Sequence, residues 1–204
     1  RFQGWNDSPL SEKGESNALA LKERLKDTSF YEVYSSPAGR ALTTAQIVSG
    51  FEINRIIPDK NLREINLGSW QGRLVKEVEA EYPKEYSAFW FSPHLYKRKG
   101  SETYYDVQKR ALVTINNIVK KYFDKNINIL LVTHAITLKT IMAHFESRDF
   151  AKLWDPPFLY DTCLNIIEIK DGKSDIILHG DATHITNIED YEFLSKTHLL
   201  DREK

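Results

Sequence analysis

Apolar and polar positions along the chain follow the period of a helix in several long segments. There the apolar residues recur every three or four positions, which places them on one helix face. Ser11 offers a hydroxyl in front of the first such segment, where an N-cap is expected. Pro83 is expected to end the third. The pattern predicts helices at residues 11–25, 38–48, 74–82, 102–122 and 136–144.

Short apolar runs between these segments predict β-strands. Residues 129–133 form the most apolar run and are expected to be a strand buried on both faces. Residues 164–169 and 175–178 flank the turn Asp171-Gly172, which predicts a hairpin. Two further short strands are expected at 31–35 and 55–58.

The alternation of helices and strands predicts an α/β fold. We expect a three-layer sandwich, with a mostly parallel central sheet and helices on both faces. One domain should cover residues 1–204, with a small aromatic cap inserted at about 73–101, in which the aromatic segment 89–93 is expected to be irregular. In such sheets function lies at the carboxyl ends of the strands. That rule selects residues 34–40 and 133–135.

Composition narrows the classes of function. Lys and Arg number 28 against 29 Asp and Glu, so the net charge of −1 argues against a general nucleic-acid binder. The apolar runs are too short for a transmembrane helix. The single cysteine, Cys163, excludes a disulfide or a cysteine-based zinc site within one chain, and it fits a cytoplasmic protein. No histidine cluster has metal-ligand spacing, so no metal is expected.

Three residues could carry chemistry at the selected positions. His134 stands before a helix N-terminus, where anions bind, or it is a core histidine. Arg40 could grip a phosphate through two hydrogen bonds, or it is a surface arginine. Glu64 has apolar neighbours, and burial would raise its pKa and suit it to proton donation. The alternative for Glu64 is an ion pair with Arg63.

Two more features leave alternatives open. The loop at Gln3-Gly4 could offer an amide and a backbone N–H to an anion, or it is a plain connection. The aromatic residues Phe89, Trp90 and Tyr96 could cap a pocket or pack as a small core.

Several ordered motifs resemble those of the histidine phosphatase (phosphoglycerate mutase-like) superfamily. Residues 1–14 are similar to the stretch just after its catalytic motif, and residues 35–45 to its second arginine motif. Residues 62–72 look like its acidic loop and residues 132–135 like its second histidine. Residues 100–102 are similar to the Gly-Glu motif that opens its long helix. The resemblance covers nearly the whole chain.

The resemblance implies a mechanism. A histidine attacks phosphorus and becomes a phosphohistidine, which water then hydrolyses, without a metal or another cofactor. Arg40 and His134 would stabilise the phosphoryl charge, and Glu64 would protonate the leaving oxygen. The phosphate site would be lined by Gln3, Gly4, Arg40, His134 and Ala135. The substrate pocket would be lined by Trp5, Phe89, Trp90, Tyr96 and Glu102.

One motif of the family does not occur in this sequence. The family's first strand ends in Arg-His-Gly, which supplies the nucleophilic histidine and the first arginine, and no Arg-His-Gly is found here. We expect that strand upstream of Arg1, in the middle of the sheet. Without it the chain would be a catalytically inactive phosphate-binding or interaction protein.

The region between the acidic loop and the long helix separates two activities of the family. The mutases carry a longer basic insertion there, whereas residues 86–96 are short and aromatic, as in the broad-specificity bacterial phosphatases. We therefore expect a phosphatase for small phosphorylated metabolites, with a cofactor-dependent phosphoglycerate mutase as the alternative. It should be a cytoplasmic monomer or homodimer without nucleic-acid or membrane partners.

Overall fold

Three parallel strands form the central sheet of the computed structural model, which describes residues 1–186. Their order is β2 (Ile56–Pro58), β1 (Phe30–Ser35), β3 (Asn128–Val132). The predicted hairpin is confirmed: β4 (Leu164–Lys170) pairs antiparallel with β5 (Lys173–Asp181) as a second, two-stranded sheet. Its turn residues Asp171 and Gly172 both have positive φ, as a two-residue hairpin turn requires.

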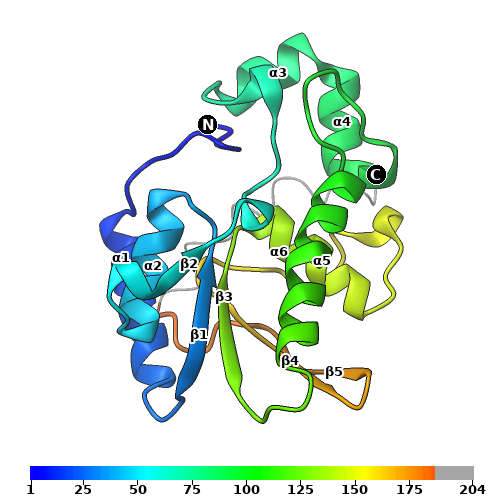
Figure 1. Ribbon diagram of the computed structural model, residues 1–204. Helices are drawn as coiled ribbons and strands as arrows, with labels where there is room; N and C mark the ends of the chain where they lie inside the picture. Colours follow the sequence, from blue (N-terminus) through cyan, green and yellow to red (C-terminus); the bar gives the residue numbers. More distant parts are fainter. Residues whose placement is uncertain (187–204) are drawn as a thin grey trace.

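Helices cover both faces of the central sheet, as predicted (Figure 1). Helices α1 (Glu12–Arg24) and α2 (Gly39–Ser49) lie on one side, and α5 (Tyr104–Lys121) and α6 (Ala135–Phe145) lie on the other. The expected N-cap of α1 is present, because the Ser11 hydroxyl accepts a hydrogen bond from the backbone N–H of Gly14. None of the helices in residues 1–186 is long and apolar enough to cross a membrane.

The cap contains two helices where the sequence predicted one. Helix α3 (Val75–Glu81) is followed at once by α4 (Pro83–Phe91), and both lie beyond the carboxyl ends of the central strands. Pro83 begins α4, because a proline is tolerated in the first turn of a helix. The expectation that the aromatic segment 89–93 is irregular is therefore wrong, since Phe89 and Trp90 complete α4 and a short 3-10 helix follows at Pro93–Leu95.

The aromatic residues of the cap belong to the largest hydrophobic core. Trp70, Phe89, Tyr96 and Tyr104 are all almost fully buried. Their ring centroids lie 5.1–6.0 Å apart at tilted or edge-on angles, which are favourable aromatic geometries. The Tyr104 hydroxyl also donates to the Phe89 carbonyl oxygen at 2.8 Å. The cap and α5 thus share one core.

This packing predicts a large loss of stability when Trp70 is truncated. Trp70→Ala should lower the free energy of unfolding by about 3–5 kcal/mol, because a buried indole leaves a cavity. Leu95→Ala in the same cap should change it by less than about 0.5 kcal/mol, because Leu95 is 67% exposed. Urea unfolding of both variants measures the difference, and equal effects would contradict this description of the core.

A large cavity separates β3 from β4. One edge of β3 pairs with β1, and within residues 1–186 no strand pairs with its other edge. A cavity of about 1260 Å³ is lined by β3, by β4 and by apolar residues of the four flanking helices. Residues 129–132 are only half-buried, so the prediction of a strand buried on both faces is wrong. Protein interiors contain few voids larger than a water molecule, so a cavity of this size is exceptional.

Candidate active site

Two of the predicted site residues meet at the carboxyl ends of neighbouring strands. His134 follows β3 and is the N-cap residue of α6. Arg40 follows β1 and is the second residue of α2. Their side chains are in contact, with 3.2 Å between Arg40 Nη2 and His134 Nδ1. The parallel pairing of β1 with β3 brings these ends together, as expected for a site on an α/β sheet.

The contacts of His134 fix which of its nitrogens carries the proton. A guanidinium can only donate, so His134 Nδ1 accepts from Arg40. Nε2 therefore carries the hydrogen and donates to Ser36 Oγ at 2.7 Å. Burial and the charges of Arg40 and Arg110 lower the pKa of His134 to about 3. The imidazole is neutral at neutral pH. Ser36 lies in the segment 34–40 that the sequence analysis selected, although it was not named there as a site residue.

The depressed pKa of His134 predicts how stability depends on pH. The pKa is about 3 in the folded protein and about 6.5 in an unfolded chain. Between these values the unfolded state binds more protons, so stability should fall as the pH drops below about 6.5. His134→Gln keeps an acceptor and a donor but does not titrate. From pH 7 to pH 5, the free energy of unfolding, measured with urea, should fall by about 1–2 kcal/mol less in this variant than in the parent. An identical decrease in both proteins would contradict the low pKa of His134.

The N-terminal loop lies across the start of α2. Arg40 Nη1 donates to the Asn6 carbonyl oxygen at 3.1 Å and lies 3.4 Å from Asp7 Oδ1. The other Asp7 oxygen accepts from the backbone N–H of Gly39 at 2.7 Å. Burial raises the pKa of Asp7, but the hydrogen bonds from the backbone N–H groups of Gly39 and Ser8 and the charge of Arg40 outweigh it and hold this pKa below its usual range. The exposed Asp7 carboxylate therefore occupies the anion-binding end of α2.

Gln3 and Gly4, which the sequence analysis predicted to line the phosphate site, begin this loop. Gly4 has φ of +56°, and a Cβ there would lie 2.6 Å from Gln71 Oε1, so the position requires glycine. The Gly4 carbonyl oxygen is 3.5 Å from Arg40 Nη2. Gln3 is exposed, and its amide donates to Ser8 Oγ at 2.7 Å.

Glu64 points at the N-terminus of α6. Its carboxylate accepts from the backbone N–H groups of Ile136 and Thr137, each at 3.2 Å, and of Ile65 at 2.9 Å. These bonds favour the ionised form, but burial outweighs them and raises the pKa of Glu64. Arg63 forms no ion pair with it; its guanidinium lies 5.1 Å from the ring centroid of Trp5.

The residues predicted for the substrate pocket separate into two groups. Trp5 is 44% exposed, and its indole N–H donates to the Glu64 carbonyl oxygen at 2.8 Å. Trp90 is half-buried and borders the cavity. Phe89 also borders the cavity but is almost fully buried in the aromatic core. Tyr96 lies in that core, with its hydroxyl 3.0 Å from Ser101 Oγ, and is not among the residues that border the cavity.

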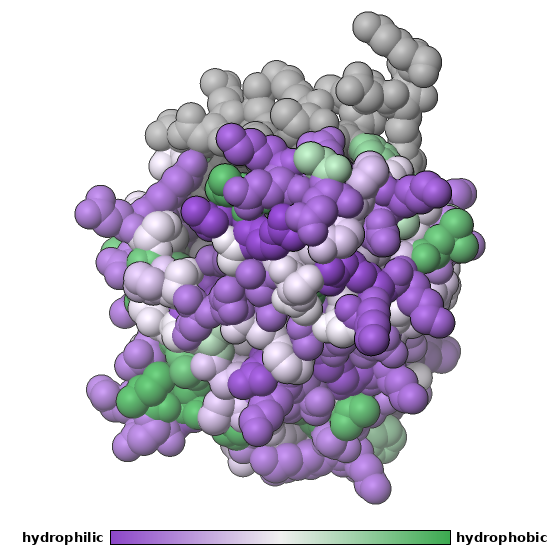
Figure 2. Space-filling model, turned by 90° about the horizontal axis from the view of Figure 1, so that it is seen from above, coloured by the Kyte–Doolittle hydropathy of each residue, from purple (hydrophilic) through white to green (hydrophobic). Residues whose placement is uncertain are grey.

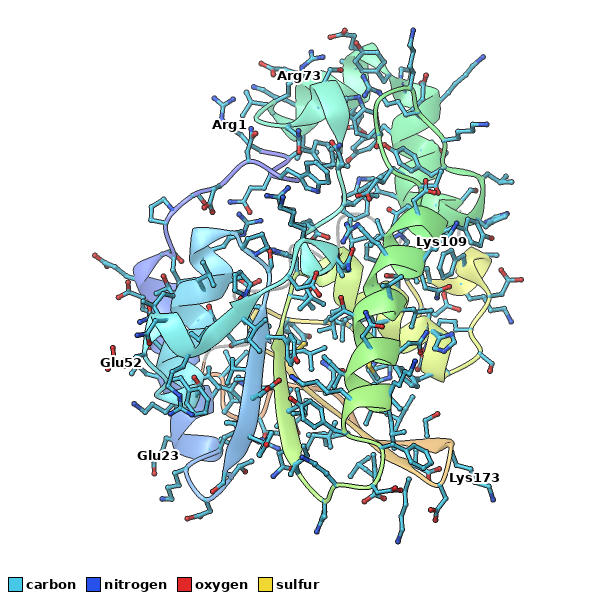
Figure 3. The ribbon with its side chains drawn as sticks, in the orientation of Figure 1. Arg1, Glu23, Glu52, Arg73, Lys109 and Lys173 are labelled. Atoms are coloured by element: carbon cyan, nitrogen blue, oxygen red, sulfur yellow. The ribbon has the colours of Figure 1, made fainter. Side chains whose placement is uncertain are left out.

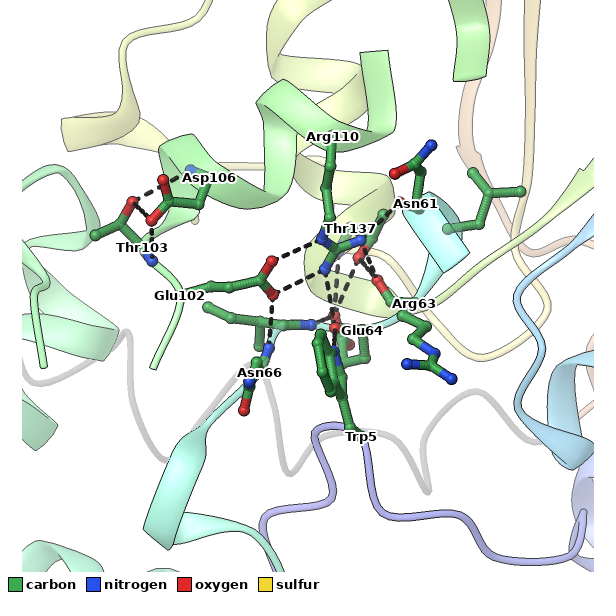
Figure 4. Close-up of polar contacts among 12 residues, drawn as sticks. Trp5, Asn61, Arg63, Glu64, Asn66, Glu102, Thr103, Asp106, Arg110 and Thr137 are labelled. Carbon is green, nitrogen blue, oxygen red and sulfur yellow. Dashed lines mark hydrogen bonds and ion pairs between the residues drawn. The ribbon is translucent and has the colours of Figure 1, made fainter. Parts of the chain in front are cut away.

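Glu102 and Ala135 complete the predicted set. Glu102 pairs with Arg110 at 2.8 Å and accepts from the Asn66 backbone N–H at 2.8 Å (Figure 4). Both of these partners of Glu102 are protein groups. Ala135 is exposed as the first residue of α6, beside His134.

The cavity between β3 and β4 is continuous with this site. Among its lining residues are Arg40, Glu64, His134 and Ala135. Arg1 lies beside the cap, and its side chain donates to the Gly72 carbonyl oxygen at 2.7 Å (Figure 3). The surface at the cap end of the molecule is mainly hydrophilic, and its exposed hydrophobic residues form small, separate patches (Figure 2).

Comparisons with known proteins identify the class. The family model of the histidine phosphatase superfamily (branch 1) matches residues 1–182. The chain belongs to this superfamily. The structure is similar to a protein titled Bacillus stearothermophilus YhfR, with 41% identity, a TM-score of 0.87 and 91% of each chain covered.

Two curated relatives carry activities in their names. The metal-independent phosphoserine phosphatase of Arabidopsis thaliana is 30% identical over 92% of this chain and 77% of its own length. Phosphoserine phosphatase 1 of Hydrogenobacter thermophilus is 28% identical over 76% of this chain and 72% of its own length.

Proposed function

We propose that this protein is a phosphatase that hydrolyses small phosphomonoesters through a phosphohistidine and needs no metal ion. It is a phosphoric monoester hydrolase of the histidine phosphatase type. The observation that carries the proposal is the contact of Arg40 with His134, beside a helix N-terminus that also holds the Glu64 carboxyl group. This arrangement supports the proposal, because it would bring two hydrogen-bond donors for a phosphoryl group close to one proton donor for a leaving group.

Arg40, Glu64 and His134 have different roles in the first step, the transfer of the phosphoryl group to a histidine. A histidine nitrogen attacks phosphorus, the bond from phosphorus to the ester oxygen breaks, and that oxygen takes the proton of Glu64. Arg40 and His134 Nε2–H donate to the phosphoryl oxygens as negative charge develops on them. Burial raises the pKa of Glu64, and a bound phosphate dianion raises it further, because like charges disfavour ionisation.

The second step reverses the roles. Water attacks phosphorus, the bond from phosphorus to histidine nitrogen breaks, and inorganic phosphate leaves. The Glu64 carboxylate now accepts a proton from the attacking water. The carboxyl group ends the cycle protonated, as it began.

The nucleophilic histidine is assigned to a strand that fills the cavity between β3 and β4. Both strands have an edge without a partner within residues 1–186, and the cavity between them is lined by apolar side chains. A strand that paired parallel with the free edge of β3 would end near the carboxyl end of β3, close to His134. We propose that this strand ends in the Arg-His-Gly motif of the family.

The substrate is a small phosphorylated metabolite. Phosphoserine is the first candidate, because two relatives are named as phosphoserine phosphatases. The aromatic residues Trp5 and Trp90 offer contacts for the organic part of the substrate. The enzyme acts in the cytoplasm as a monomer or homodimer, without nucleic-acid or membrane partners.

The test is to trap the intermediate in the full-length protein with phosphoserine labelled in its phosphoryl group. We expect free phosphate as the product, and a protein-bound label that is stable to base and lost in acid, as a phosphorus–nitrogen bond requires. Peptide mapping should place the label on a histidine other than His134. Label on His134 would overturn the assignment of the nucleophile, and phosphoryl transfer back to substrate without release of phosphate would favour the mutase.

A further inference from the structure

We propose that Arg110 is a positioning residue for the proton donor: with Glu102 it holds the loop of residues 59–66, which contains Glu64, so that the Glu64 carboxyl group reaches the leaving oxygen. This inference rests on the proposed role of Glu64 and adds two residues to the machinery of the reaction. Neither residue touches the phosphoryl site. They act through the backbone of the loop.

The Arg110 guanidinium donates hydrogen bonds to three backbone carbonyl oxygens in the loop of residues 59–66 (Figure 4). Nη1 donates to the carbonyl oxygens of Asn61 at 2.6 Å and Arg63 at 2.7 Å. Nη2 donates to the carbonyl oxygen of Glu64 at 2.9 Å. One rigid, planar group therefore fixes the backbone on both sides of the Glu64 nitrogen.

Glu102 fixes both the guanidinium and the far end of the loop. Its two carboxylate oxygens accept from Arg110 Nε at 2.8 Å and Nη2 at 3.0 Å. One of them also accepts from the Asn66 backbone N–H, and the Glu102 backbone N–H donates to the Asn66 carbonyl oxygen at 2.9 Å. Both charged side chains are largely buried, with 15% of Arg110 and 20% of Glu102 exposed.

The opposite side of the loop is bound by the segment that carries His134. Thr133 Oγ1 donates to the Leu62 carbonyl oxygen, and Thr137 Oγ1 donates to that of Arg63, both at 2.7 Å. The loop is therefore held between α5 and the start of α6. A general acid acts only within hydrogen-bond reach of the oxygen that it protonates. Loss of the hydrogen bonds from Arg110 on α5 should therefore slow proton transfer from Glu64 more than it weakens phosphate binding.

Two substrates that differ in their need for the acid distinguish a positioning role of Arg110 from a purely structural one. Departure of an alkoxide needs the acid, whereas 4-nitrophenolate leaves without a proton. In the full-length enzyme, Arg110→Met should lower kcat/KM for phosphoserine by about 30-fold or more, a part of the 10²–10⁴ that a general acid supplies. The loss for 4-nitrophenyl phosphate should be less than about threefold. The ratio of the two substrates does not depend on how much of the variant is folded.

The matched control is Arg148, which also forms an ion pair and donates to backbone carbonyl oxygens, but not to those of residues 59–66. It pairs with Glu146 at 2.8 Å and donates to the carbonyl oxygens of Asp155 and Pro156. Its side chain is 16% exposed, close to the value for Arg110. Arg148→Met should leave the ratio of the two substrates at the parental value.

Glu64→Gln separates failure of this inference from failure of the proposed function. If Glu64→Gln changes the ratio and Arg110→Met does not, the positioning role is overturned while Glu64 remains the acid. If neither variant changes it, the role of Glu64 itself is wrong. Arg110→Lys retains the charge but has no planar set of donors, and it should restore less than half of the lost activity towards phosphoserine. Full rescue by lysine would mean that charge alone accounts for the effect.

Discussion

Glu64→Gln is expected to lower kcat for phosphoserine by about 10²–10⁴-fold, the usual contribution of a general acid. Glutamine keeps the shape of the side chain, and its amide oxygen can still accept from the backbone N–H groups of Ile136 and Thr137. The substitution therefore removes the transferable proton and leaves the N-terminus of α6 occupied. The value of kcat/KM for 4-nitrophenyl phosphate, which reports only the steps up to departure of the leaving group, should fall far less, because that leaving group needs no acid.

The pH dependence of the same variant provides a second measurement. Burial raises the pKa of Glu64, so the parental rate with phosphoserine should decline on the alkaline side, as the acid loses its proton. The variant should lose this alkaline decline. Binding of inorganic phosphate, measured by calorimetry, should remain near the parental value. A variant that lost phosphate binding together with turnover would place Glu64 in the phosphate site.

The sequence predicted the elements that local pattern determines. The helical spacing and the hydroxyl of Ser11 locate α1, and the turn Asp171-Gly172 locates the hairpin. The same local rules were ambiguous at Pro83, because a proline both ends one helix and begins another. The burial of β3 could not be predicted from its own residues, since it depends on which strand occupies its second edge.

The site was predictable where residues follow parallel strands. Arg40 and His134 were both selected because each follows a strand, and the structure brings them into contact. Ser36 lies in the segment after β1 that the same rule selected, but its residue type alone did not indicate a contact with His134. Arg110 could not be found in this way. Its acceptors are backbone carbonyl oxygens 46–49 positions earlier in the chain, and a carbonyl oxygen has no signature in a sequence.

Arg40→Met should lower kcat/KM by about 10²–10³-fold for both phosphoserine and 4-nitrophenyl phosphate, because it removes a charged donor from the developing phosphoryl charge. Unlike the loss of the acid, this loss does not depend on the leaving group. Arg40 now donates to His134 Nδ1 and lies beside Asp7. A bound phosphoryl group competes with Asp7 for the guanidinium, so inorganic phosphate should also bind more weakly to the variant.

Arg24→Met is the control for the loss of one arginine. Arg24 lies at the end of α1 and pairs with Asp181 at 2.8 Å, away from His134. Its replacement should leave both kcat/KM values within about twofold of the parent, as for a surface substitution outside the site. Arg40→Lys should recover part of the binding of phosphate, since it restores the charge, but less of kcat/KM, since one ammonium cannot reproduce the planar donors. Parental activity in Arg40→Met would place the phosphoryl site elsewhere, because the arginine and the histidine would then meet for a structural reason alone.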